Sequence, residues 1–145
     1  MAERRSSHRT QWAAQFAVAS ELCKQGYQVA LTLGNHPDVD LMAESPKGVQ
    51  FKIDVKGQYK PGFWIIRQRD PIANLFYVLV YVPDDKPNQF FALSQEQVNA
   101  EIVLHVDRVK QRQMKKGKPG DKADLVKGVP WDFAKKFENW DALPR

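Results

Sequence analysis

The pattern of apolar and polar positions predicts one helix at the start of the chain and then a series of strands. From His8 to Gln25 the apolar residues recur at helical spacing and Gly26 follows, which predicts an amphipathic helix with a glycine at its end. The predicted buried stripe of this helix consists of Trp12, Phe16, Ala19 and Cys23. Alternating or continuously apolar runs then predict five or six strands, at residues 27–33, 39–44, 49–56, 63–67, 75–82 and 90–93.

Two further helices are predicted after these strands. Ser94, followed three residues later by Gln97, has the form of a capping box and opens an apolar stripe at helical spacing. Residues 114–128 are basic and interrupted by Gly and Pro, which predicts a loop, and a last short helix begins near Pro130. Helix, strands and helices in this order predict an α/β protein with a mixed central sheet flanked by helices.

The composition agrees with one globular domain over residues 1–145. Hydrophobic residues make up 43% of the chain and charged residues 27%, which excludes an intrinsically disordered protein. The longest apolar run, residues 75–82, is much shorter than the roughly 20 residues of a membrane-spanning helix. The chain begins without the apolar stretch of a secretory signal, and its single cysteine, Cys23, has no partner for an internal disulfide. We therefore expect a cytoplasmic protein that does not bind membranes.

A basic segment accounts for the charge of the protein. The net charge is +5, and residues 107–127 carry eight Lys and Arg against three Asp, a surplus of the same size. Such a cluster is typical of nucleic-acid-binding proteins, and it predicts that residues 107–128 form a basic, mobile segment in which Lys115, Lys116 and Lys118 contact phosphate. A solvated loop that only keeps the protein soluble is the alternative.

A predicted β-hairpin brings two acidic residues together. The sequence Pro46-Lys47-Gly48 suits a three-residue turn, in which proline presets the first backbone angle and glycine takes the left-handed position. Ser45 then pairs with Val49, and the same register places Asp40 directly opposite Asp54 on the polar face of the hairpin. A four-residue turn would pair Asp40 with an apolar residue and mix the two faces. The pattern therefore favours the three-residue turn.

The predicted pair of carboxylates, with a lysine nearby, indicates metal-dependent chemistry. Two carboxylates this close repel each other unless a cation lies between them, and Mg²⁺ binds such oxygen ligands at about 2.1 Å. Lys56 lies two residues after Asp54 on the same face, where it would stabilise charge developing on a phosphate or help to deprotonate an attacking water. The alternative is a surface hairpin with ordinary Asp–Lys pairs across its strands.

With an acidic residue, 13 intervening residues and then Asp54-Val55-Lys56, the hairpin resembles the PD-(D/E)xK nuclease superfamily, which has the restriction-endonuclease-like fold. The likeness covers about residues 10–110 and the tail, through Leu22-x-x-x-Gly26-Tyr27, Asp40-Leu41, the strands 76–80 and 90–94, and residues 139–143. It implies an αβββαβ core with the active site at one edge. It also implies a Mg²⁺ or Mn²⁺ ion held by Asp40, Asp54 and the Val55 carbonyl, with Lys56 assisting the water and Gln15 in an orienting role.

One position departs from the pattern of this superfamily. The first helix usually offers a Glu seven residues before the Leu of Leu-x-x-x-Gly-Tyr, and this chain has Gln15 there. A neutral amide binds a metal through its carbonyl oxygen, but it adds no charge and cannot act as a base. Three hypotheses remain: a metal-dependent endonuclease acting on nucleic acid, with DNA preferred; a catalytically weakened or inactive nucleic-acid-binding module of the same fold; and an interaction component of a defence system. Cleavage of both strands of a duplex would favour a homodimer.

Overall fold

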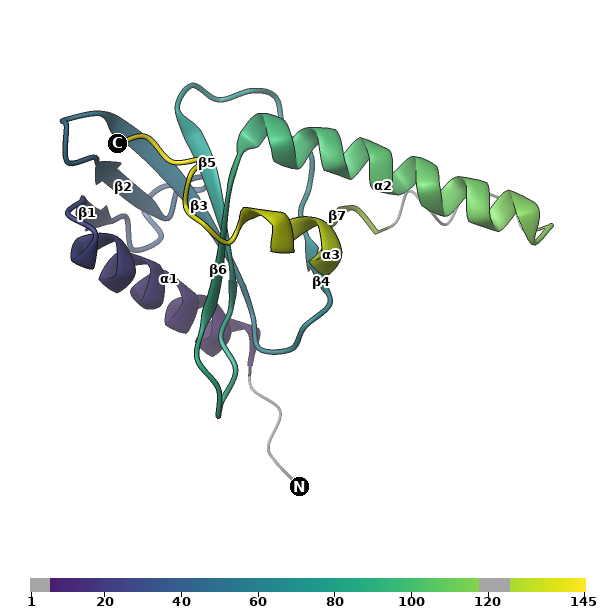
Figure 1. Cartoon of the computed structure of the whole chain (residues 1–145), viewed down its shortest axis with the longest axis horizontal. Coiled ribbons are helices and arrows are strands. Elements are labelled where there is room, and N and C mark those ends of the chain that lie inside the picture. The colour runs from purple at the N-terminus through teal and green to yellow at the C-terminus, as the bar shows by residue number, and fades with distance from the viewer. Residues whose placement is uncertain (1–5, 118–125) are drawn as a thin grey trace.

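The computed structural model describes residues 6–117 and 126–145, which form an α/β protein built on a mixed five-stranded sheet (Figure 1). Helix α1 lies on one face of this sheet, and α2 and α3 lie on the other. The elements in chain order are α1 (Ser7–Lys24), β1 (Gln28–Leu31), β2 (Leu41–Glu44), β3 (Gln50–Gln58), β4 (Phe63–Ile65), β5 (Leu75–Tyr81), β6 (Gln89–Ser94), α2 (Gln95–Lys115), β7 (Gly128–Pro130) and α3 (Trp131–Ala134), followed by a 3₁₀ turn (Lys135–Phe137).

The strand order of the main sheet is β1-β2-β3-β5-β6, with β3 in the centre. Strands β3 and β5 pair in parallel, whereas every other neighbouring pair is antiparallel. A parallel pair requires the chain to cross back to the start of the next strand. Residues 59–74 make this crossing, and they contain β4 in place of the helix that the αβββαβ order implies. The predicted α/β class and mixed sheet are confirmed at this coarser level.

Each face of the sheet carries its own apolar core. Alternate residues of β3, namely Phe51, Ile53 and Val55, are buried on the face covered by α1. On the opposite face, Tyr77 and Leu79 of β5 are buried with residues of β6 and α2. Because β5 is buried on both faces, its apolar run is continuous rather than alternating, as the sequence predicted for a central strand.

The predicted buried stripe of the first helix is wrong. Phe16 is 53% exposed and Cys23 is exposed, whereas Ala14, Val18 and Leu22 are buried. The helix turns Ala14 toward β3 at a close contact, where a Cβ added at Gly57 would lie 2.5 Å from the Cβ of Ala14, so an aromatic ring has no room there. The larger rings stay outside this contact, where Trp12 and Phe16 stack on each other with centroids 5.6 Å apart.

The predicted register of the β2–β3 hairpin is confirmed over β2, from Leu41 to Glu44. Leu41 pairs with Ile53 and Glu44 pairs with Gln50, as the three-residue turn requires. Gly48 has a φ of +89°, which is the left-handed conformation expected of it. One side of β3 packs against α1, and Asp54 on the other side faces Arg69 of the crossover segment.

The C-terminal region contains a longer helix and one more strand than the pattern predicts. The capping box of Ser94 and Gln97 is present. Helix α2 extends to Lys115, which lies in the predicted loop of residues 114–128. Strand β7, between the predicted loop and the last helix, pairs with β4 in a small second sheet. Of the predicted phosphate contacts, Lys115 and Lys116 are exposed at the end of α2, and Lys118 lies outside the described residues.

The close contact between α1 and β3 predicts the effect of a methyl group at Gly57. A Cβ added there would lie 2.5 Å from the Cβ of Ala14 and 3.2 Å from the carbonyl oxygen of Thr10. We expect Gly57→Ala to lower the free energy of unfolding by about 1–3 kcal/mol, measured by urea denaturation. Adding Ala14→Gly removes the opposing methyl group, so the double variant should lose less than the sum of the two single losses. Strict additivity would contradict the close contact.

Candidate active site

The four residues expected to form the site come together from three parts of the chain. Asp40 directly precedes β2, Asp54 and Lys56 lie on β3, and Gln15 lies on α1. The amide nitrogen of Gln15 is 3.5 Å from Asp40 Oδ1, and Lys56 Nζ is 3.2 Å from Asp54 Oδ1. The residues predicted from the sequence therefore form one polar cluster.

Asp40 lies just before β2, and the β2–β3 ladder ends at the pair of Leu41 and Ile53, one residue short of Asp40 and Asp54. The backbone N–H of Asp40 donates to the carbonyl of Ile53 at 2.9 Å, although Ile53 already pairs with Leu41. The predicted direct pairing of Asp40 with Asp54 is therefore wrong. The backbone of Asp40 instead bonds to Ile53, one residue before Asp54. The Asp40 carboxylate is instead held by β3 itself, because Oδ2 accepts a hydrogen bond from the N–H of Val55 at 2.8 Å.

A second glutamine of α1, Gln11, also holds β3 at this point, and the sequence analysis missed it. Its Nε2 donates to the carbonyl of Val55 at 2.5 Å, and its Oε1 accepts from the N–H of Gly57 at 3.2 Å. The Val55 carbonyl, a predicted metal ligand, therefore already accepts one hydrogen bond and keeps one lone pair. The spacing of Gln11 and Gln15, four residues apart, was the sequence feature that could have indicated a shared helix face.

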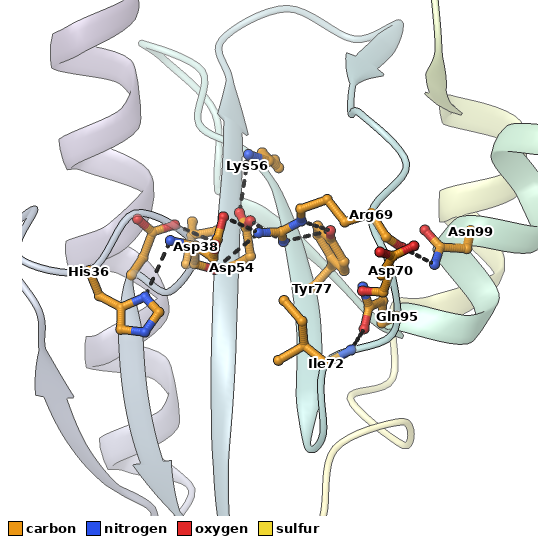
Figure 2. A network of polar contacts seen from close by, with 12 residues as sticks. His36, Asp38, Asp54, Lys56, Arg69, Asp70, Ile72, Tyr77, Gln95 and Asn99 are labelled. Carbon is orange, nitrogen blue, oxygen red and sulfur yellow. Dashed lines mark hydrogen bonds and ion pairs between the residues drawn. The ribbon is translucent and has the colours of Figure 1, made fainter.

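Arg69 is the largest addition that the structure makes to the site. Its guanidinium donates to Asp54 Oδ2 and to Asp38 Oδ1, both at 2.8 Å, and to the hydroxyl of Tyr77 at 2.7 Å (Figure 2). Arg69 belongs to the crossover segment between β4 and β5. No motif of the sequence singled it out, because only the parallel pairing of β3 and β5 brings it to Asp54.

The segment that carries Arg69 is anchored by the first turns of α2. The side chain of Gln95 accepts from the N–H of Ile72 at 2.7 Å and donates to the carbonyl of Asp70 at 3.0 Å. Asn99 donates to the carbonyl of Arg69 itself at 2.9 Å. These three hydrogen bonds appear together in Figure 2, and they position the guanidinium beside Asp54.

Burial raises the pKa of both central carboxylates. For Asp54, which is only 5% exposed, desolvation is the main cause, and the nearby charge of Asp40 adds to it. Desolvation is also the main cause for Asp40, against the hydrogen bond from Val55. In both cases Lys56 and Arg69 favour the charged form but do not compensate fully. The raised pKa values therefore reflect burial that the charges of Lys56 and Arg69 offset only in part.

The remaining oxygen atoms of the cluster suit a hard divalent cation. Asp54 Oδ1 is buried and has no hydrogen bond among the described residues, apart from its ion pair with Lys56. Within the described part of the chain, no three His, Cys, Asp or Glu side chains gather closely enough to hold a metal alone. A metal would therefore rely on Asp40, Asp54 and the Val55 carbonyl, with waters completing its shell as is usual for Mg²⁺.

Comparison with known proteins does not assign this chain to a class. No protein-family model, no curated protein and no solved structure matches this chain. None of the described helices combines the length and the apolar character that a bilayer crossing requires. The geometry of the polar cluster and its surroundings is therefore the basis for a proposed function.

The raised pKa of Asp54 predicts how the stability of the metal-free protein depends on pH. A carboxyl with a raised pKa binds its proton more tightly in the folded state, so the ionised form destabilises the fold above that pKa. Asn cannot ionise, and we expect Asp54→Asn to be more stable than the wild type at pH 7 by on the order of 1 kcal/mol. The difference should shrink as the pH falls through the raised pKa, where the wild-type carboxyl becomes neutral.

Urea unfolding in EDTA between about pH 4 and pH 8 tests this expectation. Asp85→Asn, at an exposed position in the β5–β6 turn, is the control and should stay within about 0.5 kcal/mol of the wild type. A less stable Asp54→Asn variant at pH 7 would show that the ion pairs of Asp54 outweigh its burial.

Proposed function

We propose that this protein is a metal-dependent nuclease that hydrolyses phosphodiester bonds, with DNA as the preferred substrate. The observation that carries the proposal is the convergence of Gln15, Asp40, Asp54 and Lys56 in one polar cluster, in which burial raises the pKa of both carboxylates. The proposal includes the restriction-endonuclease-like arrangement of the core and a place in the PD-(D/E)xK superfamily, which the hairpin pattern favours. Location of the protein in the cytoplasm and its assembly as a homodimer are parts of the same proposal.

The residues of the cluster fit the roles that such a reaction needs. Asp40, Asp54 and the Val55 carbonyl supply the oxygen ligands for Mg²⁺ or Mn²⁺, and the chemistry gained with the cation is polarisation of the phosphoryl group and activation of a water. Lys56, whose side chain is 38% exposed, lies where it can donate to the attacking water or to the phosphate. Gln15 holds Asp40 in place through its amide.

A catalytically inactive nucleic-acid-binding module is the second candidate, and Arg69 is the observation that favours it. Its guanidinium already neutralises Asp54 and Asp38 at 2.8 Å, so an internal cation takes part of the role of a metal. Gln15 also provides no third negative charge. In this case the cluster would be a structural ion network, and the basic residues Lys115 and Lys116 would carry the binding.

Plasmid cleavage separates the two candidates. With Mg²⁺ or Mn²⁺, the wild-type protein is expected to nick or linearise supercoiled plasmid. Gel electrophoresis measures the conversion of the supercoiled form. Asp54→Ala removes a ligand and Lys56→Met removes the catalytic ammonium, so each should reduce the rate by at least about 100-fold. Asp85→Ala, a surface carboxylate far along the chain from the cluster, is the control and should cleave like the wild type. Absence of cleavage by the wild type under both metals would reject the nuclease.

Metal affinity, measured by calorimetry with Mn²⁺, tests the cluster without any substrate. Gln15→Glu adds a third negative ligand, and Arg69→Gln removes the cation that competes for Asp54, so each should tighten binding by about tenfold or more. Arg67→Gln is the matched control, since Arg67 is an exposed arginine on the same segment. An unchanged affinity in Gln15→Glu would place Gln15 outside the metal site. Binding by Arg69→Gln but not by the wild type would support the inactive module.

A further inference from the structure

A basic cleft lies between α2 and α3, on the side of the sheet opposite α1. Its volume is about 920 Å³, and α2 supplies one wall while Pro130, α3 and the 3₁₀ turn after it supply the other. Figure 1 shows the ribbons of α2 and α3 on this side of the sheet. The cationic residues that line it are Arg108, Arg112, Lys115 and Lys136. None of them belongs to the cluster around Asp54.

The sequence of α2 aligns the cations of this cleft along one face. Arg108, Arg112 and Lys115 follow each other at intervals of four and three residues, which places them in a row on the helix. The buried residues of α2 end at Val106, so this row lies on the half of the helix that does not pack against the core. From the other wall, Lys136 faces the same space and contacts the ring of Phe133.

The cations that line the cleft outnumber its acidic residues by four to two. Glu101 is buried at the inner end and is paired with Arg108, and Asp132 is the other acidic residue of the lining. Among the described residues, no ion pair holds Arg112 or Lys136. A cleft of this kind suits a ligand with several negative charges.

A pair of rings connects this cleft with the candidate active site. Lys56 lines a smaller hollow of about 260 Å³ together with Phe63 of β4. Phe63 in turn contacts His105, which lines the basic cleft, and the ring centroids are 4.9 Å apart. The space beside Lys56 and the basic cleft are therefore separated by one aromatic contact.

We infer that the cleft between α2 and α3 binds the phosphate backbone of a polynucleotide, along a path that leads from Lys56 across Phe63 and His105. The inference rests on the proposed function, because it names where the substrate runs beyond the bond to be cleaved. Free inorganic phosphate shares the chemistry of the backbone, but a row of cations along two turns of helix matches a chain of phosphates rather than a single anion.

Binding of duplex DNA in EDTA tests the cleft without cleavage. A fluorescein-labelled duplex and fluorescence anisotropy give the Kd at several salt concentrations. The double variant Arg112→Glu with Lys136→Glu should weaken binding by about tenfold or more, and loss of two phosphate contacts should reduce the slope of log K against log salt by about 1.8. Neutral replacements of both residues by Gln should give the same reduction of the slope with a smaller loss of affinity.

The matched control reverses the same number of charges elsewhere. Lys47 and Lys86 are exposed in the β2–β3 and β5–β6 turns, and the double variant Lys47→Glu with Lys86→Glu has the same net charge as the cleft variant. It should bind nearly as well as the wild type, with the unfolding temperature of all variants measured in parallel. If the control pair weakens binding as much as the cleft pair, the effect is one of overall charge and the inference is overturned.

His105 reports directly on occupation of the cleft. Burial lowers its pKa, and the charges of Arg108 and Arg112 lower it further against the opposing charge of Glu101. A bound polyanion should raise that pKa, which NMR of the imidazole measures. Inorganic phosphate at the same concentration of phosphate groups should leave it nearly unchanged, and an equal shift would overturn the polynucleotide in favour of a small-anion site.

The failure of the inference and that of the proposed function are distinguishable. Plasmid cleavage by the wild type together with duplex binding that is insensitive to the cleft variant would reject the cleft and retain the nuclease. Absence of cleavage together with cleft-dependent binding would reject the nuclease and retain the cleft.

Discussion

The close approach of α1 to β3 is the contact on which the rest of the site depends. At this point a glycine on the strand faces an alanine on the helix, and no larger pair would fit. This proximity allows two glutamine side chains of α1 to reach the backbone of β3 and the carboxylate of Asp40. A helix held farther away would leave the Val55 carbonyl and Asp40 without these partners. The packing of small residues is therefore what makes the polar geometry possible.

The second constraint is the burial of negative charge in the middle of a sheet. A carboxylate at the position of Asp54 is unfavourable unless cations accompany it, and this chain provides Lys56 on the same strand and Arg69 from the crossover segment. Arg69 is itself held from three sides, through Asp38, Tyr77 and the backbone contact of Asn99. The ion pair of Asp54 with Arg69 links β3 to the crossover segment, and the hydrogen bond of Asn99 links that segment to α2. These three parts lie far apart in the sequence.

The parts of the fold that follow from local patterns could be predicted from the sequence. The register of the hairpin follows from Pro46-Lys47-Gly48, because the turn and the alternation agree on one pairing. The capping box at Ser94 likewise marks the start of α2 correctly. Both depend on residues within a few positions of each other.

The parts that depend on distant contacts could not be predicted in the same way. The periodicity of the first helix shows that a stripe exists, but the steric limit at Gly57 decides that Ala14 rather than Phe16 is buried. Strand β7 is only three residues long and exists as a strand through its pairing with β4. Arg69 reaches Asp54 only because the chain crosses back to form a parallel pair, and no local spacing records that step.

The side chain of Gln95 has a consequence for the evolution of this protein. It is only 5% exposed, and it satisfies one N–H and one C=O of the segment around Asp70 at the same time. Only an amide of this length offers both a donor and an acceptor there, so a replacement would leave a buried backbone group without a partner. Because both partners are backbone groups, related sequences should keep glutamine at position 95 while the side chains at 70 and 72 vary, with proline excluded at 72 because it has no N–H to donate.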